Sequence, residues 1–133
     1  MQTVFCVGGV TVETRDHLFF ACPVSRSVWK TVLQRLGADY MCHCWDQELE
    51  AAVNSFKGNS LFARLGRCCF AITVYCIWQE RNQRIFQGKY RIEDVIIRDV
   101  DSYIKARTWN WKVARNFRNW LICKYWGIES ILM

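Results

Sequence analysis

Hydrophobic residues recur every three or four positions along most of the chain, which predicts a succession of helices. The first predicted helix begins at Pro23 and stops at Gly37. Proline suits a first helical turn, whose amides lack internal partners, and glycine is the commonest residue just beyond a helix end. The buried face of this helix is expected to contain Val28, Trp29, Val32, Leu33 and Leu36.

Two further helices are predicted in the middle of the chain. One is capped by Asp46 and stops at Gly58, and its apolar face consists of Leu49, Ala52, Val53 and Phe56. The next opens at Asn59-Ser60 and runs to about Phe86. Its middle is apolar almost all round, which marks the central, most buried element. Its polar end, residues 79–84, is expected to emerge into water.

The last third predicts two more helices. The fourth begins near Ile92, and its apolar stripe consists of Val95, Ile96, Val100, Tyr103, Ile104 and Trp111. The fifth covers Arg115 to Trp126. Aromatic residues at helical spacing belong to a core more often than to a surface, so the fifth helix is expected to bury Phe117, Trp120, Leu121 and Tyr125.

The front of the chain is different, because Gly8-Gly9 predicts a tight turn between two short extended pieces, Thr3–Val7 and Val10–Glu13. A length of 133 residues suits one domain. We therefore expect a single domain over residues 1–133, mainly α. It would be an irregular bundle of about five helices with a small N-terminal turn or hairpin.

Charge is distributed unevenly along the chain. The net charge is +6; residues 1–66 carry six basic and six acidic side chains, whereas residues 67–133 carry twelve basic and six acidic ones. No acid lies between Asp101 and Glu129. A basic C-terminal half of this kind attracts polyanions, of which nucleic acid is the usual one, although a solvated helix surface would have the same composition.

The eight cysteines indicate an intracellular, reducing setting rather than a disulfide framework. No secretory signal opens the chain, and the adjacent Cys68 and Cys69 with nearby Cys76 are typical of small residues packed in a helix. The longest uncharged apolar run, Cys68 to Trp78, is too short to cross a bilayer, so no membrane partner is expected.

Candidate metal chemistry lies in residues 1–30. Cys6 precedes His17 by eleven residues, and Cys22 follows it by five. With a cysteine at position 9 the pattern would be C-x2-C-x7-H-x4-C, a closed structural zinc site of four soft or borderline ligands.

Two blocks of the chain resemble the reverse-transcriptase zinc-binding domain of plant non-LTR retrotransposons. The first is Glu13–Phe20 followed by Cys22-Pro23, Ser25-Arg26 and Val28-Trp29, and the second is Ile77–Phe86. The resemblance spans most of residues 4–107. It implies an accessory domain that follows a polymerase, binds zinc and nucleic acid, and is located in the nucleus. Its ligand pattern falls on Cys6, position 9, His17 and Cys22.

Position 9 departs from the family pattern because it is Gly9, which has no side-chain ligand. Three ligands and a water make an open site, which is weak for a structural finger. A replacement ligand would have to come from elsewhere, and Cys42, His43 and Cys44 are the obvious donors. The alternative is that Cys6 and Cys22 are packed thiols and no zinc is bound. Residues 1–30 are thus interpreted as a degenerate zinc-finger-like motif ahead of a helical body, residues 31–133.

The basic C-terminal stretch also contains interleaved aromatic residues, a combination that binds single-stranded nucleic acid by stacking and phosphate contact. Trp109 falls off the predicted stripe and is the better stacking candidate. The candidate nucleic-acid contacts are Arg107, Trp109, Lys112, Arg115, Arg118 and Lys124. RNA or single-stranded DNA is the expected partner.

Motifs of enzymes are missing from the sequence: there is no aromatic-x-Asp-Asp run, nuclease-like acid cluster, P-loop, Rossmann glycine pattern or G-x-S-x-G. We therefore expect a non-catalytic nucleic-acid-binding module. The alternative is a protein-interaction or structural remnant that exposes an apolar surface and forms a homodimer through it.

Overall fold

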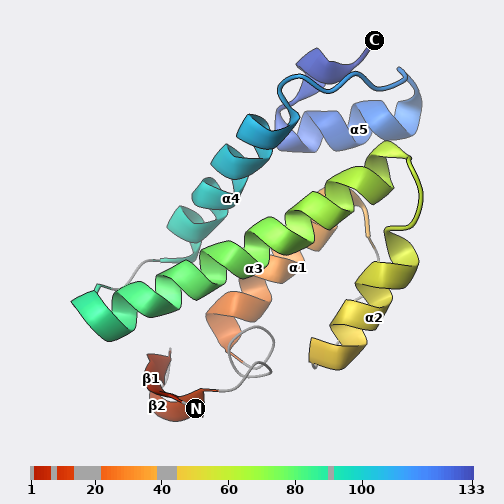
Figure 1. The fold of residues 1–133 in the computed structure, drawn as a ribbon. Helices are drawn as coiled ribbons and strands as arrows, with labels where there is room; N and C mark the ends of the chain where they lie inside the picture. Colours follow the sequence, from red (N-terminus) through yellow and green to blue (C-terminus); the bar gives the residue numbers. More distant parts are fainter. Residues whose placement is uncertain (1, 7–8, 14–21, 39–44, 90–91) are drawn as a thin grey trace.

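The computed structural model describes residues 2–6, 9–13, 22–38, 45–89 and 92–133. The described chain is mainly helical, as predicted, with five α-helices packed together (Figure 1). Their bounds are α1 Pro23–Leu36, α2 Trp45–Ser55, α3 Leu61–Gln87, α4 Glu93–Thr108 and α5 Phe117–Trp126. A short 3-10 helix, η2, follows at Glu129–Ile131.

The ends of α1 follow from local sequence. Pro23 occupies its first turn, and Gly37 ends it with φ +75°, a left-handed conformation that glycine adopts without strain. All five expected core residues of this helix are buried. The prediction for α1 is confirmed.

The longest helix, α3, is the central element of the bundle (Figure 1). The Ser60 hydroxyl caps it by accepting a hydrogen bond from the Ala63 amide at 3.1 Å. Leu65, Cys69 and Cys76 are buried in the core that α3 forms with its neighbours. By length and composition α3 is apolar enough to cross a membrane, and 44% of its most apolar 18-residue window is buried within the described fold.

The prediction that the polar end of α3 emerges into water is wrong. Glu80, Arg81 and Arg84 are all buried. The Nε atom of Arg84 donates to Glu80 Oε1 at 2.6 Å, one helical turn away, and Arg81 donates to the Ser25 hydroxyl of α1 at 3.4 Å. Opposite charges compensate one another inside the protein, and this allows a sequence that looks like a solvated helix end to be buried.

Helix α2 buries only part of its expected apolar face. Ala52 and Phe56 are buried, but Leu49 is 39% exposed and Val53 is 57% exposed. The helix begins at Trp45, one residue before the predicted cap. It is tied to α1 by the indole of Trp29, which donates to the buried carboxylate of Glu48 at 2.5 Å.

Helix α4 packs through the predicted positions Ile96, Val100 and Ile104, whereas Tyr103 is 41% exposed. It ends at Thr108, so Trp111 lies in the following connection, where it packs against the core while half-buried. The expected core stripe of α5 is wrong. Its buried residues are Ile122, Cys123 and Trp126, and Phe117, Trp120 and Tyr125 are exposed.

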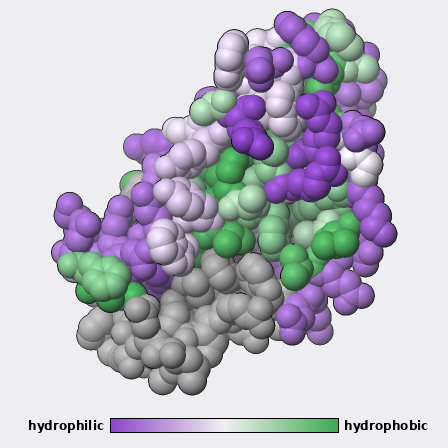
Figure 2. Space-filling model, viewed as in Figure 1, coloured by the Kyte–Doolittle hydropathy of each residue, from purple (hydrophilic) through white to green (hydrophobic). Residues whose placement is uncertain are grey.

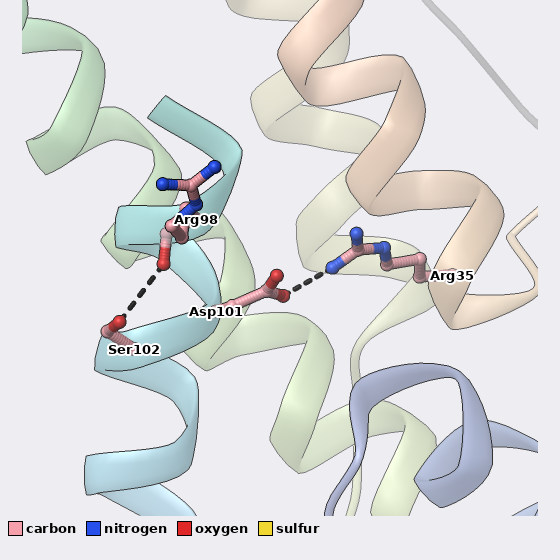
Figure 3. A network of polar contacts seen from close by, with 4 residues as sticks. All are labelled: Arg35, Arg98, Asp101 and Ser102. Atoms are coloured by element: carbon pink, nitrogen blue, oxygen red, sulfur yellow. Dashed lines mark hydrogen bonds and ion pairs between the residues drawn. The ribbon is translucent and has the colours of Figure 1, made fainter. Parts of the chain in front are cut away.

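Three helices meet at one arginine of α1. Arg35 forms an ion pair with Asp101 of α4, while Ser102 of α4 donates to the carbonyl of Arg98 at 3.1 Å (Figure 3). The guanidinium of Arg35 also lies over the Trp126 ring of α5, 5.2 Å from its centre. These contacts hold the C-terminal end of α4 and α5 against α1.

The N-terminal strands β1 Gln2–Cys6 and β2 Gly9–Glu13 pair antiparallel in the backbone. Their register sets Cys6 opposite Gly9 at the turn.

Candidate nucleic-acid interface

The sequence-predicted basic residues lie at one end of the bundle, on α4, α5 and the connection between them. Arg107 is in the last turn of α4, Lys112 and Arg115 are in the connection, and Arg118 and Lys124 are on α5. All five are exposed. They belong to one stretch of the chain, which has no acidic residue between Asp101 and Glu129.

Aromatic rings share this surface. Trp109 is 75% exposed, in agreement with its place off the apolar stripe, and Phe117 is equally exposed. Phe117 and Trp120 lie side by side, with ring centres 6.2 Å apart and planes 30° apart. Exposed rings are the groups on which unpaired bases stack.

Two of the predicted cations contact rings directly. The Lys124 ammonium is 4.9 Å from the centre of the Trp120 ring, and the Arg118 guanidinium is 4.6 Å from that of Phe62 on α3. Because a cation over a ring face retains its charge, these contacts orient the side chains without neutralising them.

Arg115 is held differently from the other predicted cations. Its Nε atom donates to the backbone carbonyl of Met133 at 3.0 Å, which fastens the C-terminal segment beside the start of α5. That helix is capped by Asn116, whose side-chain oxygen accepts from the Asn119 amide at 2.9 Å. Arg115 therefore has a structural role in addition to its positive charge.

A groove of about 870 Å³ between α3 and α4 adds residues that the sequence interpretation missed. Of the predicted contacts only Arg107 lines it. Its other charged and aromatic lining residues are Arg64, Arg67, Tyr75, Tyr103 and Trp111. They come from two helices and a turn, so no local run of charge signals them.

The two tyrosines of the groove are neighbours, with ring centres 5.7 Å apart in an edge-to-face arrangement. The nearby Tyr75 is the main cause that raises the pKa of Tyr103 above its ordinary value. A raised tyrosine pKa keeps the phenol uncharged in neutral and mildly alkaline solution.

The candidate metal ligands fall mostly outside the described side chains. His17, Cys42, His43 and Cys44 are outside the described residues, and Cys6 is described by its backbone alone. Cys22 is fully buried at the start of α1. Within the described ranges there is no group of three histidine, cysteine or acidic side chains that could hold a metal. With Gly9 opposite Cys6, the turn of the hairpin offers one thiol where a closed zinc site needs two.

The thiols of the helical body behave as small hydrophobic groups. Burial raises the pKa of Cys69 well above its ordinary value, and burial also raises the pKa of Cys123. Both thiols therefore remain protonated and unreactive at neutral pH, in keeping with their place in the core.

No family model, curated protein or solved structure matches the chain.

Proposed function

We propose that this chain is a non-catalytic nucleic-acid-binding accessory domain, derived from a retrotransposon reverse-transcriptase protein and carrying a degenerate zinc site. One observation supports it most strongly. Phe117, Trp120 and Tyr125 of α5, which helical spacing assigned to the core, are exposed, and so are Trp109 and the basic residues of the same C-terminal stretch.

The chemistry of this surface fits an unpaired strand better than a duplex. Lysine and arginine meet phosphates of either form, but exposed rings such as Trp109, Phe117 and Trp120 can stack only on bases that are not already stacked in a helix. RNA or single-stranded DNA is thus the proposed partner.

A charge-matched pair of variants tests the location of binding. The first variant carries Arg107→Gln, Lys112→Gln, Arg118→Gln and Lys124→Gln. The control carries Lys30→Gln, Lys57→Gln, Lys89→Gln and Arg98→Gln, four exposed cations elsewhere on the described surface. Each lowers the net charge from +6 to +2, that is 6 − 4, so any difference between them reflects position rather than total charge.

Fluorescence anisotropy with labelled single-stranded RNA and DNA at low salt is the measurement. We expect the first variant to lose at least about tenfold in affinity, because phosphate contacts supply most of such binding, and the control to retain most of it. Equal losses in both variants would contradict the proposed interface. Absence of binding by the wild-type chain would reject the function.

The alternative, a protein-interaction remnant, is favoured by a different surface. An apolar groove of about 410 Å³ lies between α2 and α3, lined by Leu49, Val53, Phe56 and Phe70 among others. Figure 2 shows hydrophobic side chains at the surface on the side of α2. A homodimer formed there would show a mass that rises with concentration in light scattering, together with no affinity for either nucleic acid.

The degenerate zinc site has its own test. The register that sets Cys6 opposite Gly9 means that Gly9→Cys adds a thiol beside an existing one at the hairpin turn. We expect this substitution to raise zinc affinity by at least about tenfold, as native mass spectrometry with graded chelator would measure, because a fourth ligand closes the tetrahedron. The matched control, Val10→Cys, adds a thiol at a position that the family's ligand pattern does not use, and it should give no gain. Equal affinity in both variants would contradict an inherited site.

A further inference from the structure

The groove between α3 and α4 combines features that are rarely assembled without a ligand. Its volume of about 870 Å³ lies within the range of small-molecule sites, roughly 300–1,000 Å³. Small side chains, among them Ala71 and Ala106, line it between the larger residues and leave it open. None of its lining residues is acidic.

Three arginines give the groove its charge. Among the described residues, none of Arg64, Arg67 and Arg107 has a carboxylate partner. Arg67 donates to the backbone carbonyls of Phe56 and Gly58, at 2.6 and 2.9 Å, which fixes its guanidinium and leaves its charge uncompensated. An anion entering the groove would meet donors whose orientation is already set.

Aromatic groups stand beside these cations. Arg64 lies over the Trp111 ring at 4.3 Å from its centre, and Tyr75 packs edge-to-face on Tyr103. Both tyrosines are more than two-fifths exposed, so their ring surfaces are open to a flat ligand. An apolar ligand would leave three guanidinium groups unpaired, and an acidic peptide would make no use of the rings.

We propose that this groove takes an unpaired nucleotide of the bound single strand, with its base on the Tyr75–Tyr103 side and its phosphate on Arg67 and Arg107. This deepens the proposed function and rests on it. The groove lies beside the predicted surface because Arg107 and Trp111 lead directly into the connection between α4 and α5. A strand that follows the exposed rings of that connection and of α5 can therefore enter the groove without leaving the protein surface.

The experiment compares two groove variants, Tyr103→Ala and Arg107→Gln, with two controls. Phe86→Ala removes an aromatic ring that is 72% exposed at the other end of α3, and Arg98→Gln removes an exposed guanidinium of α4. Anisotropy is recorded with a twelve-nucleotide oligo-uridine, with oligo-thymidine and with a DNA duplex of equal length. Circular dichroism verifies that each variant is folded.

We expect Tyr103→Ala to weaken binding of both single strands about tenfold, as loss of a stacked base does, while duplex affinity changes less than twofold. Arg107→Gln should weaken single strands to a similar degree. Each control should remain within twofold of the wild type.

Failure of this inference differs from failure of the proposed function. If the wild type binds single strands and Tyr103→Ala binds them equally well, the groove is not a nucleotide site although the domain still binds nucleic acid. A uniform loss for single strands and duplex in Tyr103→Ala would likewise overturn it, since stacking is specific to unpaired bases. If the wild type binds none of the three probes, both proposals fall.

Discussion

Replacing Glu80 by glutamine is expected to destabilise the folded chain by about 3–5 kcal/mol. The substitution keeps the shape of the side chain but removes its charge, so the buried Arg84 loses the carboxylate to which its Nε atom donates. Both side chains are almost fully buried, and water cannot take the place of the lost carboxylate. Because domains of this size are stable by only about 5–15 kcal/mol, urea denaturation should reveal a large shift of the midpoint.

Two further variants make this prediction specific. Glu50→Gln is the same chemical change at an exposed position of α2 and should stay within about 0.5 kcal/mol of the wild type. The double substitution Glu80→Leu with Arg84→Met removes both charges and should recover much of the loss, because apolar residues of similar size often replace a buried pair without cost. A Glu80→Gln protein as stable as Glu50→Gln would mean that the pair is not buried as described.

Gly66→Ala is expected to destabilise the chain by about 1–3 kcal/mol, although alanine is normally the better helix former. A methyl group at this position of α3 would lie 2.2 Å from the nearest atom of the Phe56 ring, where ordinary contact needs more than 3 Å. Phe56 is buried and packs edge-to-face on Phe62, so its ring cannot move aside freely. Gly66 is therefore what allows α2 to approach α3 closely.

The reverse exchange, alanine to glycine, at an exposed position of α3 measures the contribution of helix propensity alone. Ala71→Gly, at an exposed position, should cost about 1 kcal/mol through helix propensity alone. Combining Gly66→Ala with Phe56→Leu should cost less than the sum of the two single changes, as guanidinium denaturation would measure, since the smaller side chain relieves the clash. A gain in stability from Gly66→Ala would show that helix propensity outweighs the contact.

Helix positions are largely encoded by local signals in this sequence. Gly37 ends α1 in a left-handed conformation, and Ser60 caps α3 with its hydroxyl. Such signals act within a few residues and can be recognised without knowledge of the fold. The five helices were predictable for that reason.

The choice of buried face was less predictable, because it depends on what packs against each helix. Helix α5 has large hydrophobic residues on both sides, and the structure buries Ile122 and Trp126 while leaving Phe117 and Trp120 in solvent. At the end of α3 the sequence prediction fails in the opposite direction, because residues expected to be exposed are buried. Glu80 and Arg84 look like a solvated pair in sequence, but both are buried, and the adjacent Arg81 donates to Ser25 of α1.

Part of the candidate site could likewise be predicted from local sequence, and part of it could not. The cations from Arg107 to Lys124 lie close together in the sequence, so the uneven distribution of charge along the chain is enough to identify them. Arg64 and Tyr75 of the groove are separated from Arg107 by thirty residues or more, and only the packing of α3 against α4 brings them together. No pattern in the sequence carries that information.

The dependence of binding on salt tests the central claim most directly. The logarithm of the observed association constant for single-stranded nucleic acid should fall linearly with the logarithm of the salt concentration. Each phosphate contact is expected to contribute about −0.7 to the slope of this logarithmic plot. Four contacts, from Arg107, Lys112, Arg118 and Lys124, therefore correspond to a slope of about −3. The variant with these four residues neutralised should lose most of that slope. A wild-type chain that binds no strand at low salt, or whose affinity is unchanged as salt rises, would contradict the account.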